Sequence, residues 1–103
     1  MTSKVDPLQV VAEPRRRAIL RLVWDRELPA GDIASRFDVS FPAVSQHLAV
    51  LRDAGFVSVR REGRTRLYRA DPDALGPLRT VLEKMWTGSL DRLAQLAEEE
   101  TRR

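Results

Sequence analysis

The side chains with the most specific chemistry lie in one short segment, "VSFPAVSQHLAVLRDAGFV", at positions 39–57. Its small and amide-bearing residues share the helix face opposite an apolar stripe and carry no charge: Pro42, Ala43, Ser45, Gln46 and Ala49. A glutamine amide can pair with adenine, a serine hydroxyl can donate to or accept from several base edges, and small carbons can lie against a thymine methyl. The segment therefore favours close, noncovalent reading of DNA bases, with an ordinary surface helix as the alternative.

A cluster of arginines follows this segment within ten residues: Arg60, Arg61, Arg64, Arg66 and Arg69, offset by Glu62. The planar guanidinium group binds phosphate oxygens in pairs. Like charges this close repel one another, so we expect them along a polyphosphate backbone, with Arg64 or Arg66 entering a minor groove. A solvated strand face is the alternative.

The residues that catalysis and metal binding need are nearly absent. The chain has no cysteine and one histidine, His47. Soft or borderline metals need thiolate or imidazole ligands, so we expect neither a metal nor a cofactor. No acid is placed by the sequence to orient His47 as a catalyst, and no phosphate loop or nucleotide motif is present. We expect no enzyme, and we expect His47 to pack, with a hydrogen bond to phosphate or backbone.

The chain of 103 residues has room for one domain, residues 1–103, and its hydrophobic fraction of 43% can form a core. The net charge is +3, and it is unevenly distributed. Residues 1–70 carry thirteen basic and eight acidic side chains, whereas residues 71–103 carry five and seven. Sixteen of the eighteen basic residues are arginine, which suits an anionic partner but also follows from a GC-rich genome.

No apolar run approaches the length of a membrane span, and the first residues lack the pattern of a signal peptide. We therefore expect a cytoplasmic protein with no membrane partner.

Local signals predict the elements that position these groups. Asp6-Pro7 and Glu13-Pro14 are helix starts, and three arginines, Arg15, Arg16 and Arg17, crowd the first turn of the second helix. The helix dipole disfavours cations there, which indicates acidic neighbours or an anion nearby.

A short helix at about 31–37 precedes a turn and then a recognition helix at about 41–54, capped by Ser40 and ended by Gly55. Val44, Leu48 and Leu51 form its buried stripe. The period then changes toward two, which predicts a hairpin at about 56–69 with its turn near Glu62-Gly63. A last helix at about 72–99 follows. This order predicts a mainly α fold with a small β-hairpin and five to six helices, the winged helix-turn-helix.

Two stretches resemble the ArsR/SmtB family of bacterial repressors across roughly residues 8–98. "AEPRRRAILRLV" is similar to the family's "A-[DE]-P-T-R-x-x-I-L-x-x-L" opening, and "DIASRFDVSFPAVSQHLAVLRDAGFVSVRREGRTRLYRA" to its helix-turn-helix and wing. The resemblance implies a homodimer built through the first and last helices, with each recognition helix in a major groove of a near-palindromic operator.

The predicted DNA contacts are Ser40, Pro42, Ala43, Ser45, Gln46, His47, Arg52, Arg60, Arg61, Arg64 and Arg66. The predicted dimer contacts are Leu8, Val11, Leu78, Leu82, Met85, Trp86, Leu93 and Leu96, with a place in the chain's own core as the alternative for some of them.

The chain departs from the metal-sensing members of that family. Where such members have "E-L-C-V-C-D-L", this sequence has "ELPAGDI" at 27–33, with Pro29 and Gly31 at the cysteine positions. The last helix has Glu83 and Asp91 but no histidine to complete the second sensor type. We therefore expect no metal sensing at these sites.

The sequence predicts a sequence-specific, DNA-binding transcriptional regulator that acts as a homodimeric repressor. The alternative is a winged-helix module that binds an acidic protein through its basic wing, and an enzyme is a remote third. The effector stays open between an apolar molecule at the dimer interface near Met85 or Trp86, a partner protein, pH, and none.

Overall fold

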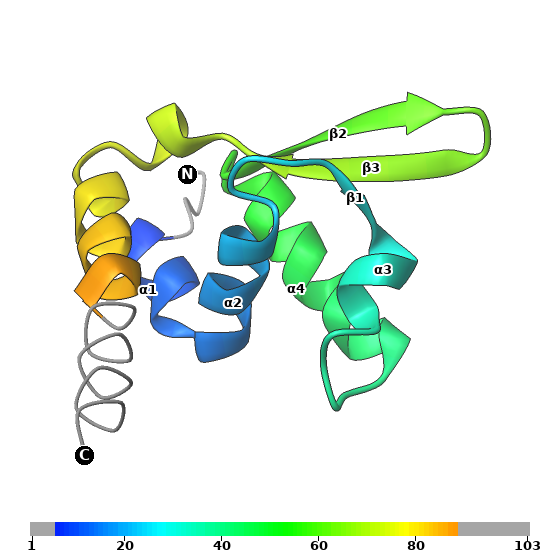
Figure 1. Ribbon diagram of the computed structural model, residues 1–103, viewed down its shortest axis with the longest axis horizontal. Helices are drawn as coiled ribbons and strands as arrows, with labels where there is room; N and C mark the ends of the chain where they lie inside the picture. The colour runs from blue at the N-terminus through cyan, green and yellow to red at the C-terminus, as the bar shows by residue number, and fades with distance from the viewer. Residues whose placement is uncertain (1–5, 89–103) are drawn as a thin grey trace, which may run out of the picture.

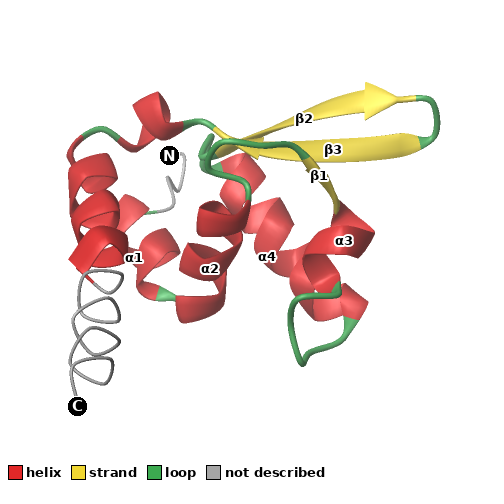
Figure 2. Ribbon diagram, viewed as in Figure 1, coloured by secondary structure: helices red, strands yellow, loops and turns green. Residues whose placement is uncertain are grey.

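The computed structural model describes residues 6–88 and is mainly helical, with one small sheet (Figures 1 and 2). In chain order the elements are α1 (Pro7–Ala12), α2 (Pro14–Leu22), β1 (Leu28–Pro29), α3 (Ala30–Ala34), α4 (Phe41–Asp53), β2 (Val57–Glu62), β3 (Thr65–Ala70) and the 3-10 helix η1 (Pro72–Leu75). Residues 77–88 are again helical, up to the last described residue. This order confirms the predicted winged helix-turn-helix fold. Among residues 6–88, no helix combines the length and the apolar composition that crossing a membrane requires.

The junction of α1 and α2 explains the three arginines at the start of α2. Arg16 donates from Nε to the Val10 carbonyl at 2.8 Å and from Nη2 to the Gln9 carbonyl at 3.1 Å. Arg17 donates from Nη1 to the carbonyls of Val11 and Ala12. The last turn of a helix leaves its carbonyls without intrahelical donors, and here two arginines of the next helix supply them. Arg16 and Arg17 are therefore held by neutral backbone carbonyls and not by an anion, and this accounts for two of the three arginines.

The first turn of α2 is completed by Glu13. Its Oε2 accepts hydrogen bonds from the backbone amides of Arg15 and Arg16 at 3.1 and 3.2 Å. One carboxylate thus caps the α2 N-terminus and lies beside the arginine charges that the dipole disfavours.

The core is built where α2 packs on α4. Val44, Leu48 and Leu51 are at most 1% exposed, as their spacing predicts, and they join a buried cluster that includes Ile19 and Leu20 from α2. Because the stripe occupies one side of α4, the other side is left free to face solvent or a ligand.

Both ends of α4 follow local rules. At its start the Ser40 Oγ accepts from the Ala43 amide at 3.3 Å, and Pro42 lies in the first turn, where its missing amide hydrogen costs nothing. At its end Gly55 has φ 83°, a left-handed value that glycine adopts without a Cβ clash. The chain then enters β2 directly.

The wing is an antiparallel hairpin in which Val57 pairs with Ala70 and Glu62 with Thr65. The turn therefore consists of Gly63 and Arg64, one residue beyond the predicted position, and Gly63 has φ 63°.

The sheet has a third strand that the sequence reading missed. β1 pairs antiparallel with β3, so that the strand order is β1-β3-β2. A strand of two residues that ends in proline is too short to show any alternation, and only its tertiary partner makes it a strand.

The prediction of one continuous last helix at about 72–99 is wrong at its start. Pro72–Leu75 is a separate 3-10 turn, and Gly76 breaks the chain direction with φ 57° and ψ −130° before helix resumes at residue 77. The remainder of the predicted helix, from residue 89 on, lies outside the described residues. The described part packs on the core through Leu82 and through Trp86, whose ring meets Trp24 edge-on at 4.9 Å between centroids.

Candidate nucleic-acid interface

The face of α4 opposite the buried stripe carries the residues that the sequence assigned to base reading. Pro42, Ser45 and Gln46 are exposed, and Ala43 is half-buried beside them. The backbone from Phe41 to Val50 can approach a groove closely, because no long charged side chain lies in this part of the helix. Base contact by these residues stays a prediction, and their exposure is what it requires.

Phe41 is a candidate that the sequence reading passed over. It is the first residue of α4, and 53% of its surface is exposed, although a side chain as large and apolar as phenylalanine is usually buried. It lies four residues before Ser45 and therefore on the same side of the helix. The i, i+4 spacing from Ser45 could have identified Phe41 from the sequence. Phe41 adds an aromatic side chain to the edge of the reading face.

The hairpin brings two arginines directly opposite one another. Arg61 pairs across the strands with Arg66, and Arg64 stands in the turn between them. All three are exposed, and none forms an ion pair with any acid among residues 6–88. Like charges placed directly opposite in a hairpin are destabilising. The tip of the wing is therefore a local concentration of positive charge that an anion would stabilise.

Arg60, unlike the adjacent Arg61, is paired with acidic side chains. Its guanidinium donates to both carboxylate oxygens of Glu27, at 2.9 and 2.8 Å, and to Glu62 at 3.0 Å. The hydrogen bond from Arg60 holds the pKa of Glu27 below its ordinary range, and the charge of Arg60 adds to this effect. The expectation that Glu62 alone offsets the wing arginines was therefore wrong. Of the predicted wing contacts, Arg60 is the least available to phosphate.

His47 contacts the α1–α2 junction and is only partly exposed. Its Nε2 lies 3.6 Å from Glu13 Oε2, and its Nδ1 lies 3.4 Å from Arg16 Nη1. The expectation that no acid is placed to orient His47 is thus wrong, because tertiary packing brings Glu13 to within 3.6 Å of its ring. Both charged neighbours also hold the helix junction, so His47 connects α4 to that junction, and its predicted role in contacting DNA gains no support from this geometry.

Arg52 lies in the last turn of α4, where its positive charge interacts favourably with the negative end of the helix dipole. Its guanidinium is half exposed, and its one ion pair in the described chain is a loose contact of 3.9 Å with Asp53. Arg52 is therefore free to reach a phosphate, as is the hydroxyl hydrogen of Ser40, whose oxygen accepts the cap bond.

No group of three or more His, Cys, Asp or Glu side chains suited to a metal ion lies within the described part of the chain. The stretch that resembles a sensor box in other family members forms β1 and the start of α3, with Pro29 in the strand and Gly31 in the helix.

The predicted dimer contacts that lie in the described chain divide into three groups by burial. Val11 and Leu82 are 8% and 1% exposed and belong to the chain's own core, so for these two the intramolecular alternative holds. Leu78 and Trp86 are partly buried against the same core. Leu8 and Met85 are 62% and 46% exposed, and Val81, which was not predicted and lies one helical turn before Met85, is 53% exposed. Leu93 and Leu96 lie outside the described residues.

Comparison with known proteins gives the chain its family. The model of the bacterial regulatory protein, arsR family, matches residues 13–59, which run from the helix junction into the wing. The HTH-type transcriptional regulator Rv2034 of Mycobacterium tuberculosis is 44% identical over 92 residues, covering 89% of this chain and 86% of that protein. The chain belongs to the ArsR family.

Other ArsR-family relatives carry names for both directions of regulation. The transcriptional repressor SdpR of Bacillus subtilis is 36% identical over 65% of this chain and 74% of its own length. The transcriptional activator HlyU of Vibrio cholerae is 35% identical over 77% of this chain and 73% of its own length. The solved structure of its reduced form superposes with a TM-score of 0.67 at 35% identity, covering 77% of this chain and 83% of that one.

A crystal structure described as a possible transcriptional regulator for arsenical resistance is 43% identical, with a TM-score of 0.68, and covers 88% of this chain and 95% of that chain. This ArsR-family chain is therefore a DNA-binding transcriptional regulator and not an enzyme, and the comparisons give no support to the alternative of a protein-interaction module.

Proposed function

We propose that this ArsR-family regulator is a cytoplasmic homodimer that represses transcription by occupying a near-palindromic operator. The observation that carries the proposal is the difference in surface chemistry between α4 and the wing. From Phe41 to Val50 the exposed face of α4 carries no Asp, Glu, Lys or Arg, and the charged residues Arg52 and Asp53 lie only in its last turn. The wing tip, in contrast, concentrates three arginines that have no acidic partner in the described chain. Base reading needs hydrogen-bonding and small groups, and backbone binding needs cations, so each surface suits one of the two tasks.

In the proposed complex α4 lies in the major groove. Ser45 and Gln46 read base edges, and Pro42 and Ala43 allow close approach. Ser40 donates its hydroxyl hydrogen to a phosphate at the start of the helix, and Arg52 binds a phosphate near its end. Arg61 and Arg66 bind the backbone beside the groove, and Arg64 at the hairpin turn is the arginine best placed to enter the minor groove.

The proposed dimer uses α1 and the helical residues 77–88. These two segments lie side by side at the end of the molecule away from the wing (Figure 1), and they expose the large apolar side chains Leu8, Val81 and Met85. Isolated exposed apolar residues are common, but three on adjoining helices favour a protein partner. A second copy related by a two-fold axis would bury the same three side chains of both chains. Two copies related by a two-fold axis read half-sites about 34–36 Å apart.

Repression is the simpler proposed outcome, because a dimer that occupies an operator overlapping a promoter needs no further contact to exclude polymerase. No metal enters the proposal, and the effector is left open. The test is a footprint of the purified protein on the promoter of its own gene, together with transcription in vitro from the same fragment. We expect two symmetric protected half-sites and a lower transcript yield.

A fragment in which one half-site is scrambled is the control and should lose most of its affinity. Protection of a single unsymmetric site would overturn the dimeric arrangement, and increased transcript yield would overturn repression while leaving DNA binding intact.

A further inference from the structure

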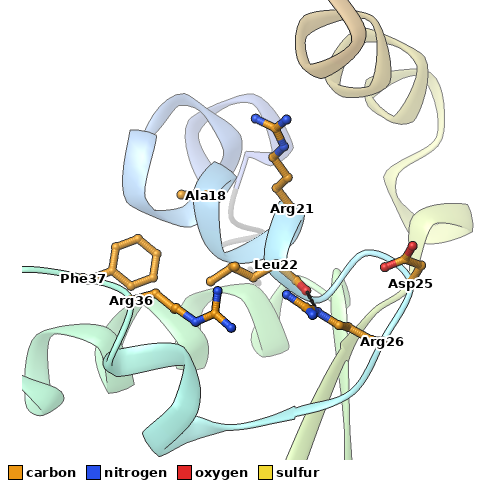
Figure 3. A pocket seen from close by; sticks show the side chains of 7 residues that line it. All are labelled: Ala18, Arg21, Leu22, Asp25, Arg26, Arg36 and Phe37. Carbon is orange, nitrogen blue, oxygen red and sulfur yellow. Dashed lines mark hydrogen bonds between the residues drawn. The ribbon is translucent and has the colours of Figure 1, made fainter. Parts of the chain in front are cut away.

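A cavity of about 750 Å³ opens between the second half of α2 and the chain that follows α3. This volume lies within the ~300–1,000 Å³ range of small-molecule sites. Its apolar wall consists of Ala18, Leu22 and Phe37. The Phe37 side chain is half-buried, so an aromatic surface is presented to whatever enters (Figure 3).

The charged part of the cavity is dominated by arginine. Figure 3 shows the guanidinium groups of Arg26 and Arg36 turned toward each other next to the Leu22 side chain. Arg26 is oriented by one hydrogen bond, from its Nε to the Leu22 carbonyl at 3.1 Å, which leaves both terminal nitrogens free to donate. Within residues 6–88 neither arginine forms an ion pair, and Asp25, the one acid in the lining, contacts neither of them at ion-pair distance.

The cavity is lined by other residues than the DNA-reading surface. Ile19 and Leu20 of α2 and its C-cap Val23 are buried in the core. The cavity uses α2 positions 18, 21 and 22, which lie around the other side of that helix, with Leu22 also packed against the edge of the core. The apolar stripe of α4 faces this same core, and its reading face points away from it. The cavity lining therefore shares no residue with the proposed DNA contacts, and the cavity arginines are a separate group from those of the wing.

We propose that this cavity binds a small amphipathic anion, with a carboxylate held between Arg26 and Arg36 and an apolar, preferably aromatic, body against Leu22 and Phe37. Guanidinium groups bind a carboxylate through paired hydrogen bonds, and two of them relieve their mutual repulsion by sharing one anion. The apolar wall excludes simple inorganic anions as preferred ligands, because they would leave it in contact with water. The proposal is independent of the operator, since binding is measured without DNA.

The test is isothermal titration calorimetry of the full chain with 2-naphthoate as the probe. We expect binding that is at least tenfold tighter than that of 2-naphthamide, which keeps the apolar body and lacks the charge, and of acetate, which keeps the charge and lacks the body. Arg36→Gln and Arg26→Gln should each weaken naphthoate binding by about tenfold. Lys84→Gln is the charge-matched control, because Lys84 is exposed on the last described helix and lies outside the cavity lining, and it should leave the affinity unchanged.

Circular dichroism establishes that each variant is folded, and amide shifts in a two-dimensional NMR titration locate the ligand independently of any substitution. We expect the largest shifts at Ala18, Leu22 and Phe37. Equal affinity for naphthoate and naphthamide, equal weakening by Lys84→Gln, or shifts centred on Trp86 instead of Phe37 would each overturn the assignment.

Discussion

Gln46 shows how much of the proposed specificity depends on single side chains. It is exposed on the uncharged face of α4, and its amide can donate and accept at the same time. Most of the surrounding contacts to DNA would be made to phosphates, which are the same in every sequence.

We expect Gln46→Ala to weaken operator binding by ~1–3 kcal/mol and to remove discrimination at one base step. Nonspecific affinity should be unchanged, because the wing is untouched. Fluorescence anisotropy with the operator, with single-base variants and with random DNA measures all three quantities. An equal loss on operator and random DNA would show that Gln46 supports the helix and does not read a base.

Arg60 and Arg61 are adjacent on β2 and form a matched pair for testing the wing. Arg61 faces Arg66 and forms no ion pair within the described chain, whereas Arg60 is held by Glu27 and Glu62. We expect Arg61→Gln to lower the magnitude of the slope of log affinity against log salt by about one, since each phosphate contact releases about one counterion. Arg60→Gln should change the slope much less, because its charge is already neutralised. Equal slopes in the two variants would contradict this assignment of free and paired arginines.

At the scale of elements, the wing is linked to a side chain that precedes it by thirty residues. Glu27 stands just before β1, and β1 pairs with β3, so the Glu27–Arg60 pair links the first strand to the far strand of the hairpin. The pairing lowers the pKa of Glu27. A lowered pKa means that the contribution of Glu27 to stability is present above its unfolded-state pKa and is lost as pH falls through the lower, folded-state pKa.

We therefore expect the Glu27 carboxyl to stay ionised through the acidic range where an ordinary glutamate begins to protonate. An NMR titration of the glutamate side-chain carbons measures this. In Arg60→Gln the Glu27 pKa should return toward its ordinary range, whereas in Arg61→Gln it should not, because Arg61 makes no contact with that carboxylate. An unchanged pKa in Arg60→Gln would place the cause elsewhere.

The recognition helix is held in place by its apolar stripe, so the two sides of α4 should respond differently to substitution. Leu48 is 1% exposed, and Leu48→Ala should lower the free energy of unfolding by about 2–5 kcal/mol through lost burial and a cavity. Ser45→Ala, on the exposed side of the same helix, should stay within ~0.5 kcal/mol. Urea denaturation followed by circular dichroism gives both values. Comparable losses would mean that Ser45 is part of the packing.

For the whole molecule, the charged and apolar surfaces lie at opposite ends. In Figure 1 the wing, which carries the arginines, is at one end, and α1 and the helical residues 77–88, which carry the exposed apolar residues, are at the other. This separation of charged and apolar surfaces suits a dimer that joins at the apolar end and binds DNA through the recognition helices and wings of both copies.

We expect Met85→Glu to shift the protein toward monomer and to weaken operator binding at least tenfold, because a charge placed at the proposed interface must be desolvated. Thr80→Glu is the control, since Thr80 is exposed on the same helix on the side away from the core contact Leu82. Sedimentation velocity measures the oligomeric state. A monomeric parent protein, or a dimer that both variants leave intact, would contradict the interface.

The features that could be predicted from the sequence are those with short-range causes. The stripe of Val44, Leu48 and Leu51 follows from helical geometry, the Ser40 cap from a side chain reaching three residues ahead, and the hairpin from alternation around Gly63. Each of these needs only a few neighbouring residues, and together they were enough to predict the fold and the face of α4 that is left exposed.

Tertiary structure decided which charges have partners. The sequence placed Arg60 among the free wing arginines, but the added strand β1 brings Glu27 to it. It placed His47 without an acid, but packing of α4 on α2 brings Glu13 beside the ring. The cavity at Arg26 and Arg36 likewise joins segments from two separate elements. A salt bridge or a cavity depends on distances in space between residues far apart in the chain, which local periodicity and capping do not determine.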